Sequence, residues 1–187
     1  MEILDHLFPN PPIPLNFKSA FTLLCAVVLS AQTTDGKVND VTKELFSVAP
    51  TPYEMAEMDI GEVQRIIKTV GLAPKKAQYL VGLSKMLIAD HNGQVPRTYE
   101  ELERLPGVGH KTASVVMSHV FGEPAIAVDT HVHRLALRWG LSKEASNVDK
   151  VQRDLCSIFP RDKWNKLHLQ MIYFGREHCV AKGHEVK

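Results

Sequence analysis

The chain of 187 residues is long enough for one large domain or two small ones with a buried core. Its 44% hydrophobic and 23% charged residues are typical of a globular protein and argue against disorder and fibrous repeats. The longest apolar stretch, residues 21–31, is much shorter than the roughly 20 residues of a membrane span, and the N-terminus lacks the basic start of a secretory signal. Three scattered cysteines form no disulfide framework and fit a reducing, intracellular setting.

Charge is distributed unevenly along the chain, although the net charge is only +1. Residues 1–130 carry 11 Lys/Arg against 15 Asp/Glu, a net of −4, whereas residues 131–187 carry 11 against 6, a net of +5. A basic C-terminal third suits contact with a polyanion. Chance asymmetry of solvated surfaces explains the same numbers equally well.

Hydrophobic spacing predicts helices along most of the chain. Apolar residues recur at helical intervals in four segments: 60–70, 80–88, 148–158 and 164–174. Residues 21–31 are apolar nearly all round, which is typical of a buried central helix. Only residues 125–128 resemble a strand, and the segment is short. We therefore expect an all-α fold of eight to ten helices.

Prolines, glycines and capping residues mark the expected joints. Four prolines within residues 9–14 indicate an extended linker. Asn147 is a good N-cap for the helix that follows it, and Thr98 with Glu101 matches a capping box. Gly175 stands where a helix is expected to stop.

The segment 105–113, LPGVGHKTA, predicts the end of one helix, a tight glycine turn and a second helix over residues 110–121. Gly107 and Gly109 permit positive φ and let the backbone approach another surface closely. The second helix starts with unpaired backbone N–H groups at the positive end of its dipole, which favours an anion such as a DNA or RNA phosphate. An ordinary tight turn between packed helices is the alternative.

Lys111 falls in the first turn of this second helix, where the dipole disfavours an ammonium group. A residue that opposes the preference of its position in a helix, with no evident gain in stability, is a candidate for function. The neutral amine that the position favours suits Schiff-base chemistry at an electrophilic carbon. A solvated lysine that reaches past the turn is the alternative.

Asp129 follows the apolar segment 125–128 and precedes a helix expected over residues 130–139. Its simplest role is that of an N-cap. Its functional role would be to stabilise developing positive charge beside a pocket, or to relay a proton. A carboxylate close to Lys111 would favour the ammonium and oppose the helix end, so the separation of the two residues decides which effect prevails.

Together these residues resemble the endonuclease III family of DNA glycosylases. Segment 105–113, followed 18 residues after Lys111 by Asp129, is similar to the family's helix-hairpin-helix and Gly/Pro-Asp signature. Three further segments support the match: residues 29–35 resemble the loop after the second helix, residues 66–72 the wedge loop, and residues 167–179 the approach to the iron–sulfur cluster. The resemblance covers nearly the whole chain.

The resemblance implies an all-α, two-domain helix-hairpin-helix glycosylase with the DNA cleft between its domains. Residues 13–123 would form a six-helix domain with the hairpin, and residues 1–12 with 124–187 would form the second domain. The implied activity is base-excision repair: removal of oxidised pyrimidines, then strand cleavage by β-elimination. The implied partner is double-stranded DNA with damaged bases or abasic sites, bound by a monomer in the cytoplasm, associated with the nucleoid and not with a membrane.

The resemblance also implies roles for individual residues. Lys111 occupies the position of the nucleophile that attacks the anomeric carbon, and Asp129 that of the assisting carboxylate. Gln32 and Leu72 occupy positions that fill the hole and wedge the duplex when the damaged base is flipped out. Without the family they would be a helix-end surface amide and a core leucine. The implied DNA contacts also include Gly107, Val108, Gly109, His110 and His131.

Two bound groups follow from the resemblance. The backbone carbonyls of Glu103, Leu105 and Val108 match positions that hold a monovalent cation in relatives. The family's [4Fe–4S] cluster needs four thiolates, but Cys179 matches only the first, and Val186 stands at the second. Either this chain lacks the cluster or the sequence stops short of the remaining cysteines, so a cluster is not expected on the chain as given.

The histidines have less specific interpretations. His110 stands where relatives often carry Arg, which weakens the expected phosphate contact and its salt dependence. Five further histidines lie in the C-terminal third: His131, His133, His168, His178 and His184. They lack the paired thiols of a zinc site, and capping, phosphate contact or surface roles suit them better.

Two other functions stay open. One is a non-catalytic helix-hairpin-helix module that binds DNA through phosphate contacts alone. The other is a monofunctional glycosylase of the same superfamily. The lysine at position 111 argues against the second, because a lyase needs an amine there.

Overall fold

The computed structural model describes residues 1–143 and 147–182. In these ranges the chain forms eleven α-helices and one 3₁₀ helix and no strand, which confirms the all-α prediction. The number exceeds the expected eight to ten because short helices form at α1 (Glu2–Leu7) and α4 (Pro52–Glu57), where the apolar period is too brief to be recognised. Residues 125–128 are buried and belong to no helix or strand. None of the described helices is long and apolar enough to cross a membrane.

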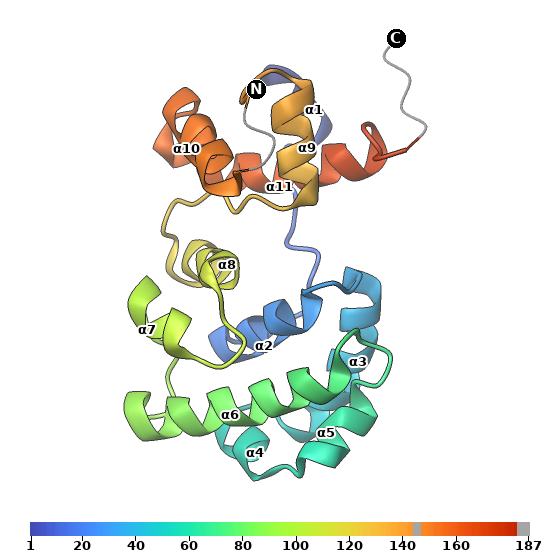
Figure 1. Ribbon diagram of the computed structural model, residues 1–187, viewed down its shortest axis with the longest axis vertical. Helices are drawn as coiled ribbons and strands as arrows, with labels where there is room; N and C mark the ends of the chain where they lie inside the picture. The colour runs from blue at the N-terminus through green and yellow to red at the C-terminus, as the bar shows by residue number, and fades with distance from the viewer. Residues whose placement is uncertain (144–146, 183–187) are drawn as a thin grey trace. The chain divides into compact units, whose positions relative to one another are not determined.

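The chain folds into two compact units, Pro14–Phe121 and Met1–Ile13 with Gly122–Lys187 (Figure 1). The Pro14–Phe121 unit holds seven helices where six were expected. Helix α5, which the apolar spacing at residues 60–70 predicts, begins at an Asp59 cap whose Oδ1 accepts from the backbone N–H groups of Gly61 and Glu62. The seven are α2 (Ala20–Ser30), α3 (Asp35–Val48), α4, α5 (Ile60–Ile66), α6 (Ala73–His91), α7 (Tyr99–Arg104) and α8 (His110–Phe121).

Helix α2 is the centre of the Pro14–Phe121 unit, as its apolar sequence predicts. Residues 21–29 are all buried, and the helix contacts α3, α6 and α8. It starts at a capping box in which the Ser19 hydroxyl accepts from the backbone N–H of Thr22, and the Thr22 hydroxyl accepts from the N–H of Ser19. Because burial of each large apolar side chain contributes about 1.5–3 kcal/mol, α2 is a principal source of stability for this unit.

The other unit joins the N-terminus to the C-terminal third of the chain. Its helices are α1, α9 (Thr130–Arg138), α10 (Val148–Ile158) and α11 (Trp164–Glu177), with a 3₁₀ turn at Arg161–Lys163. Leu4 of α1 is buried in the same core as Ile126 and Leu167. Gln170 donates from Nε2 to Asp5 Oδ1 and to the carbonyl of Phe8, each at 3.0 Å. These contacts attach the first residues to α11.

Gly175 does not stop α11, contrary to the sequence expectation. The helix continues to Glu177 and has His178 as its C-cap. A Cβ at Gly175 would lie 3.0 Å from the Cβ of His131. The glycine therefore permits close packing of α11 against α9, a contact that local sequence does not reveal.

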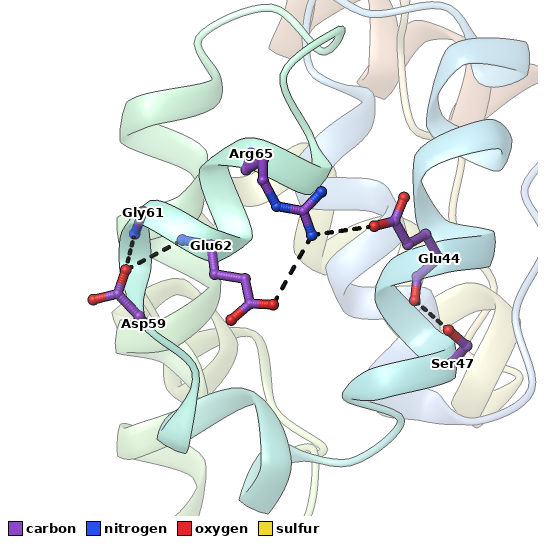
Figure 2. A network of polar contacts seen from close by, with 6 residues as sticks. All are labelled: Glu44, Ser47, Asp59, Gly61, Glu62 and Arg65. Atoms are coloured by element: carbon purple, nitrogen blue, oxygen red, sulfur yellow. Dashed lines mark hydrogen bonds and ion pairs between the residues drawn. The ribbon is translucent and has the colours of Figure 1, made fainter.

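Carboxylates gather on the surface where α3 and α5 meet (Figure 2). The Nη2 atom of Arg65 lies 3.4 Å from Glu44 Oε1 and 3.9 Å from Glu62 Oε1. All three side chains are exposed, and such pairs contribute about 0–1 kcal/mol each.

Candidate nucleic-acid interface and catalytic residues

The hairpin between α7 and α8 is anchored by buried side chains. Leu105 and Val108 are 2% and 6% exposed, and the N–H of Val108 donates to the Leu105 carbonyl at 3.1 Å. Gly107 has a φ of +77°, and a Cβ there would lie 2.6 Å from Cδ2 of Tyr79 on α6. Both the backbone conformation and this contact require glycine at position 107.

Beyond the hairpin, the start of α8 is open. A Cβ at Gly109 would meet no atom within 4 Å. The N–H of Ala113 is the first to bond within the helix, to the Gly109 carbonyl at 2.9 Å. The N–H groups of residues 110–112 have no acceptor inside the helix, and with the helix dipole they form an exposed end that favours an anion.

The His110 ring is turned back onto α7. Its Nδ1 lies 2.7 Å from Glu103 Oε1, and the ring stacks on Tyr99 with 5.2 Å between centroids. His110 therefore braces the hairpin, and the Glu103 carboxylate competes with any phosphate for its ring nitrogen. The DNA contact expected of His110 stays a prediction.

Lys111 and Asp129 lie at the starts of two helices. Lys111 is exposed in the first turn of α8. Asp129 is half-buried and caps α9, its Oδ1 accepting from the N–H groups of His131 and Val132 at 2.8 Å each. The N-cap role is thereby confirmed. Both bonds end on Oδ1 and leave Oδ2 for another partner. Lys111 belongs to the Pro14–Phe121 unit and Asp129 to the other unit.

Gln32 and Leu72 share an uncommon backbone conformation. Their φ angles are +55° and +60°, and among the described residues only Asn92 is a third non-glycine residue with positive φ. This conformation costs about 1–2 kcal/mol for residues with a Cβ and occurs preferentially at functional sites. Gln32 is exposed, and Leu72 is 58% exposed. The alternative of a core leucine at position 72 is therefore wrong.

The loops that carry Gln32 and Leu72 are in contact. The N–H of Gly71 donates to the hydroxyl of Thr33 at 3.2 Å. A Cβ at Gly71 would lie 3.2 Å from the carbonyl oxygen of Gln32. The structure therefore brings together two sequence-predicted residues that are 40 positions apart.

Lys76 connects these loops, and sequence reasoning missed it. Its side chain is buried, and Nζ donates to the carbonyls of Leu29 and Ala31 and to the hydroxyl of Thr33. The sequence carries only a weak signal for it, because Lys75 and Lys76 both lie near the start of α6, where a helix disfavours an ammonium group.

His131 packs against α11. Burial lowers its pKa below the usual range; the Asp129 carboxylate opposes this shift, and Arg134 and Arg176 add to it. Its Nδ1 lies 3.1 Å from Nη2 of Arg134. These contacts give the ring a structural role in this unit, and its DNA contact stays a prediction.

Cys179 is buried beside two arginines of α9. The sequence alone did not indicate a role for either arginine. Nη1 of Arg138 donates to Cys179 Sγ at 3.0 Å, and Nε of Arg134 donates to the Cys179 carbonyl at 3.0 Å. Cys156 is half-buried on α10, and Cys25 belongs to the Pro14–Phe121 unit. Within residues 1–143 and 147–182 no group of three His, Cys, Asp or Glu side chains is placed to hold a metal. These residues thus supply one of the four thiolates of a [4Fe–4S] cluster and do not fit that group by themselves.

The chain is similar to known proteins over most of its length. Residues 25–161 match the family described as HhH-GPD superfamily base excision DNA repair protein. Endonuclease III of Bacillus subtilis (strain 168) is 43% identical over 182 residues, which span 97% of this chain and 83% of that protein. Endonuclease III of Escherichia coli (strain K12) is 43% identical over 185 residues, 97% of this chain and 87% of that protein.

The chain belongs to the endonuclease III family of the HhH-GPD superfamily. The resemblance drawn from segment 105–113 and Asp129 is thereby confirmed, and with it a function in base excision DNA repair.

Solved structures agree with this membership. A trapped endonuclease III–DNA covalent intermediate is similar with a TM-score of 0.94 and 44% identity, over 98% of this chain and 86% of that one. A thermostable thymine-DNA glycosylase is similar with a TM-score of 0.77 and 23% identity, over 90% and 79%, and shows a shared fold alone. The endonuclease III family therefore shares both sequence and fold with this chain.

Proposed function

We propose that the chain is a DNA N-glycosylase with abasic-site lyase activity that removes oxidised pyrimidines from double-stranded DNA. The observation that carries the proposal is Lys111, exposed in the first turn of α8 directly after the glycine hairpin, in a chain of the endonuclease III family. A solved relative is a trapped endonuclease III–DNA covalent intermediate, which supports a protein nucleophile.

The reaction starts when the neutral amine of Lys111 attacks C1′ of the damaged nucleotide. A bond forms between Nζ and C1′ as the bond from C1′ to the base breaks, and the base leaves with the electron pair. The nitrogen loses one proton, and the bond from C1′ to O4′ then breaks with its electron pair on O4′, which takes up a proton, to leave a protonated imine. Loss of a proton from C2′ then breaks the bond from C3′ to oxygen and expels the 3′ phosphate.

Asp129 assists the first step through Oδ2, the oxygen not used to cap α9. Positive charge develops on the sugar as the base leaves, and a carboxylate stabilises such charge. Since Lys111 is exposed in the unbound protein, bound DNA is what excludes water from its amine.

DNA is held by contacts of two kinds. The N–H groups of residues 110–112 bind a backbone phosphate, and the carbonyls of Glu103, Leu105 and Val108 can hold a monovalent cation beside it. Gln32 and Leu72 enter the base stack while the damaged base is flipped out, because a base inside a duplex is out of reach of the amine. A protein with this substrate works at the nucleoid.

Borohydride trapping tests the proposal. The protein is mixed with a duplex that bears thymine glycol or an abasic site, and the imine is reduced. We expect a covalent protein–DNA adduct that Lys111→Ala abolishes, whereas Lys85→Ala, which removes another exposed lysine, keeps it. Tight binding without adduct or base release would indicate a non-catalytic module. Base release without strand cleavage would indicate a monofunctional glycosylase.

A further inference from the structure

A buried lysine lies behind the two loops that carry Gln32 and Leu72. Lys76 is only 3% exposed. Its Nζ lies 2.8 Å from the Leu29 carbonyl, 2.6 Å from the Ala31 carbonyl and 3.2 Å from the Thr33 hydroxyl. All three acceptors belong to the end of α2 and the loop that follows it, so one side chain of α6 caps the C-terminus of α2.

The environment of Lys76 is costly and specific. Burial lowers its pKa, and no salt bridge to it occurs among the described residues. The charge is instead met by carbonyls at the negative end of the α2 dipole, which otherwise lack intrahelical partners. Burial of the amine is therefore offset by three bonds, and these bonds fix the end of α2 and the loop after it.

The bonds of Lys76 reach the loops of both strained residues. Gln32, at φ +55°, lies between Ala31 and Thr33, which both accept from Nζ. Leu72, at φ +60°, follows Gly71, whose N–H donates to the same Thr33 hydroxyl that accepts from Nζ of Lys76, so the side chain reaches the Leu72 loop through Thr33. A left-handed conformation of such residues persists only where its surroundings enforce it.

We infer that Lys76 is a positioning residue that holds the Gln32 and Leu72 loops as one rigid wedge for entry into the DNA duplex. The inference rests on the proposed function. Insertion into a base stack requires both side chains to arrive in a fixed relation, and loops ordered beforehand lose less conformational freedom on binding. Lys76 contacts no DNA; it acts through Gln32 and Leu72.

The test compares two DNA substrates. Excision of thymine glycol from a duplex requires the base to be flipped out and the stack refilled. Borohydride trapping on a single-stranded oligonucleotide with an abasic site requires Lys111 chemistry without a duplex to open. Lys76→Met keeps an unbranched side chain that is one atom shorter, and removes its donors. Lys75→Met is the matched control, since Lys75 is the adjacent, exposed lysine and its loss changes the net charge equally.

We expect Lys76→Met to lower the single-turnover rate on the duplex by about tenfold or more relative to Lys75→Met, with single-strand trapping preserved. In a Gln32→Ala/Leu72→Ala background, Lys76→Met should have little further effect, because the residues through which it acts are gone. Equal duplex rates in the two lysine variants, or a proportional loss on both substrates, would overturn the inference while leaving the enzyme assignment intact. A wild-type protein inactive on both substrates would overturn the proposed function and the inference with it.

A milder pair of variants decides the matter if Lys76→Met does not fold. Thr33→Val removes the hydroxyl that bonds Lys76 and Gly71. Thr34→Val changes the next residue, an exposed N-cap whose side chain makes no capping bond. We expect only Thr33→Val to lower the ratio of duplex to single-strand activity. An equal ratio in the two threonine variants counts against Lys76 as a positioning residue.

Discussion

The ring of Tyr79 on α6 covers Gly107 so closely that the hairpin has no room for a side chain, with only 2.6 Å between the position of a Cβ and Cδ2 of the ring. The hairpin that presents α8 is thus held by α6, the helix that also carries Leu72 and Lys76 at its N-terminal end. One helix therefore supports both the hairpin proposed to bind phosphate and the loop proposed to wedge the duplex.

Gly107→Ala should impair both the fold and DNA binding. An alanine at φ +77° is strained and also displaces Tyr79, which together should lower the free energy of unfolding by about 1–3 kcal/mol. Thermal unfolding and duplex affinity measure the two effects. Gly109→Ala is the control for the unfolding measurement, because a Cβ there meets no protein atom within 4 Å. Equal losses of stability in the two variants would show that the Tyr79 contact is unimportant.

Substitutions of Asp129 should distinguish its role as the N-cap of α9 from its proposed role in base excision. Asn is as good an N-cap as Asp, so Asp129→Asn should keep stability and DNA binding while losing most base excision. Asp129→Ala should lose excision and about 1 kcal/mol of stability as well, since the bonds to the His131 and Val132 N–H groups disappear. Single-turnover excision and chemical denaturation measure these outcomes. An unchanged excision rate in Asp129→Asn removes Asp129 from the mechanism.

Leu72→Gly should raise the free energy of unfolding and slow base excision. Glycine adopts φ +60° without strain, and the leucine is 58% exposed, so little packing is lost. We expect a gain of up to about 1 kcal/mol in the free energy of unfolding and a slower excision from duplex DNA, because the apolar wedge is gone. Asn92→Gly relieves a similar φ of +51° at the far end of α6 and should stabilise without slowing excision. A destabilised Leu72→Gly variant would contradict this account.

Stability should depend on pH through His131. Because burial holds the pKa of His131 below its ordinary value of 6.5, the unfolded chain binds a proton more readily than the folded protein. The free energy of unfolding should therefore fall as the pH is lowered through 6.5 and level off below the folded-state pKa. Denaturation between about pH 5.5 and 7 measures the slope. His131→Gln should make it shallower, and an NMR titration of His131 at or above 6.5 would refute the prediction.

Local sequence determined the helices and the position of the hairpin. The apolar run at residues 21–31 predicted the buried α2, Asn147 predicted the start of α10, and the glycines around Val108 predicted the turn before α8. Each of these features depends on residues within about one or two helical turns of one another, so spacing and side-chain type suffice to recognise them.

Tertiary structure alone decided the features that join distant segments. Position 175, inside α11, is occupied by glycine because α9 packs closely against it. Lys76 is buried because the end of α2, some 45 residues earlier, supplies its acceptors. The positive φ of Gln32 and Leu72 is likewise maintained by contacts between their two loops. The energy of such contacts depends on which surfaces meet after folding. A local pattern of residue types does not predict which surfaces these are.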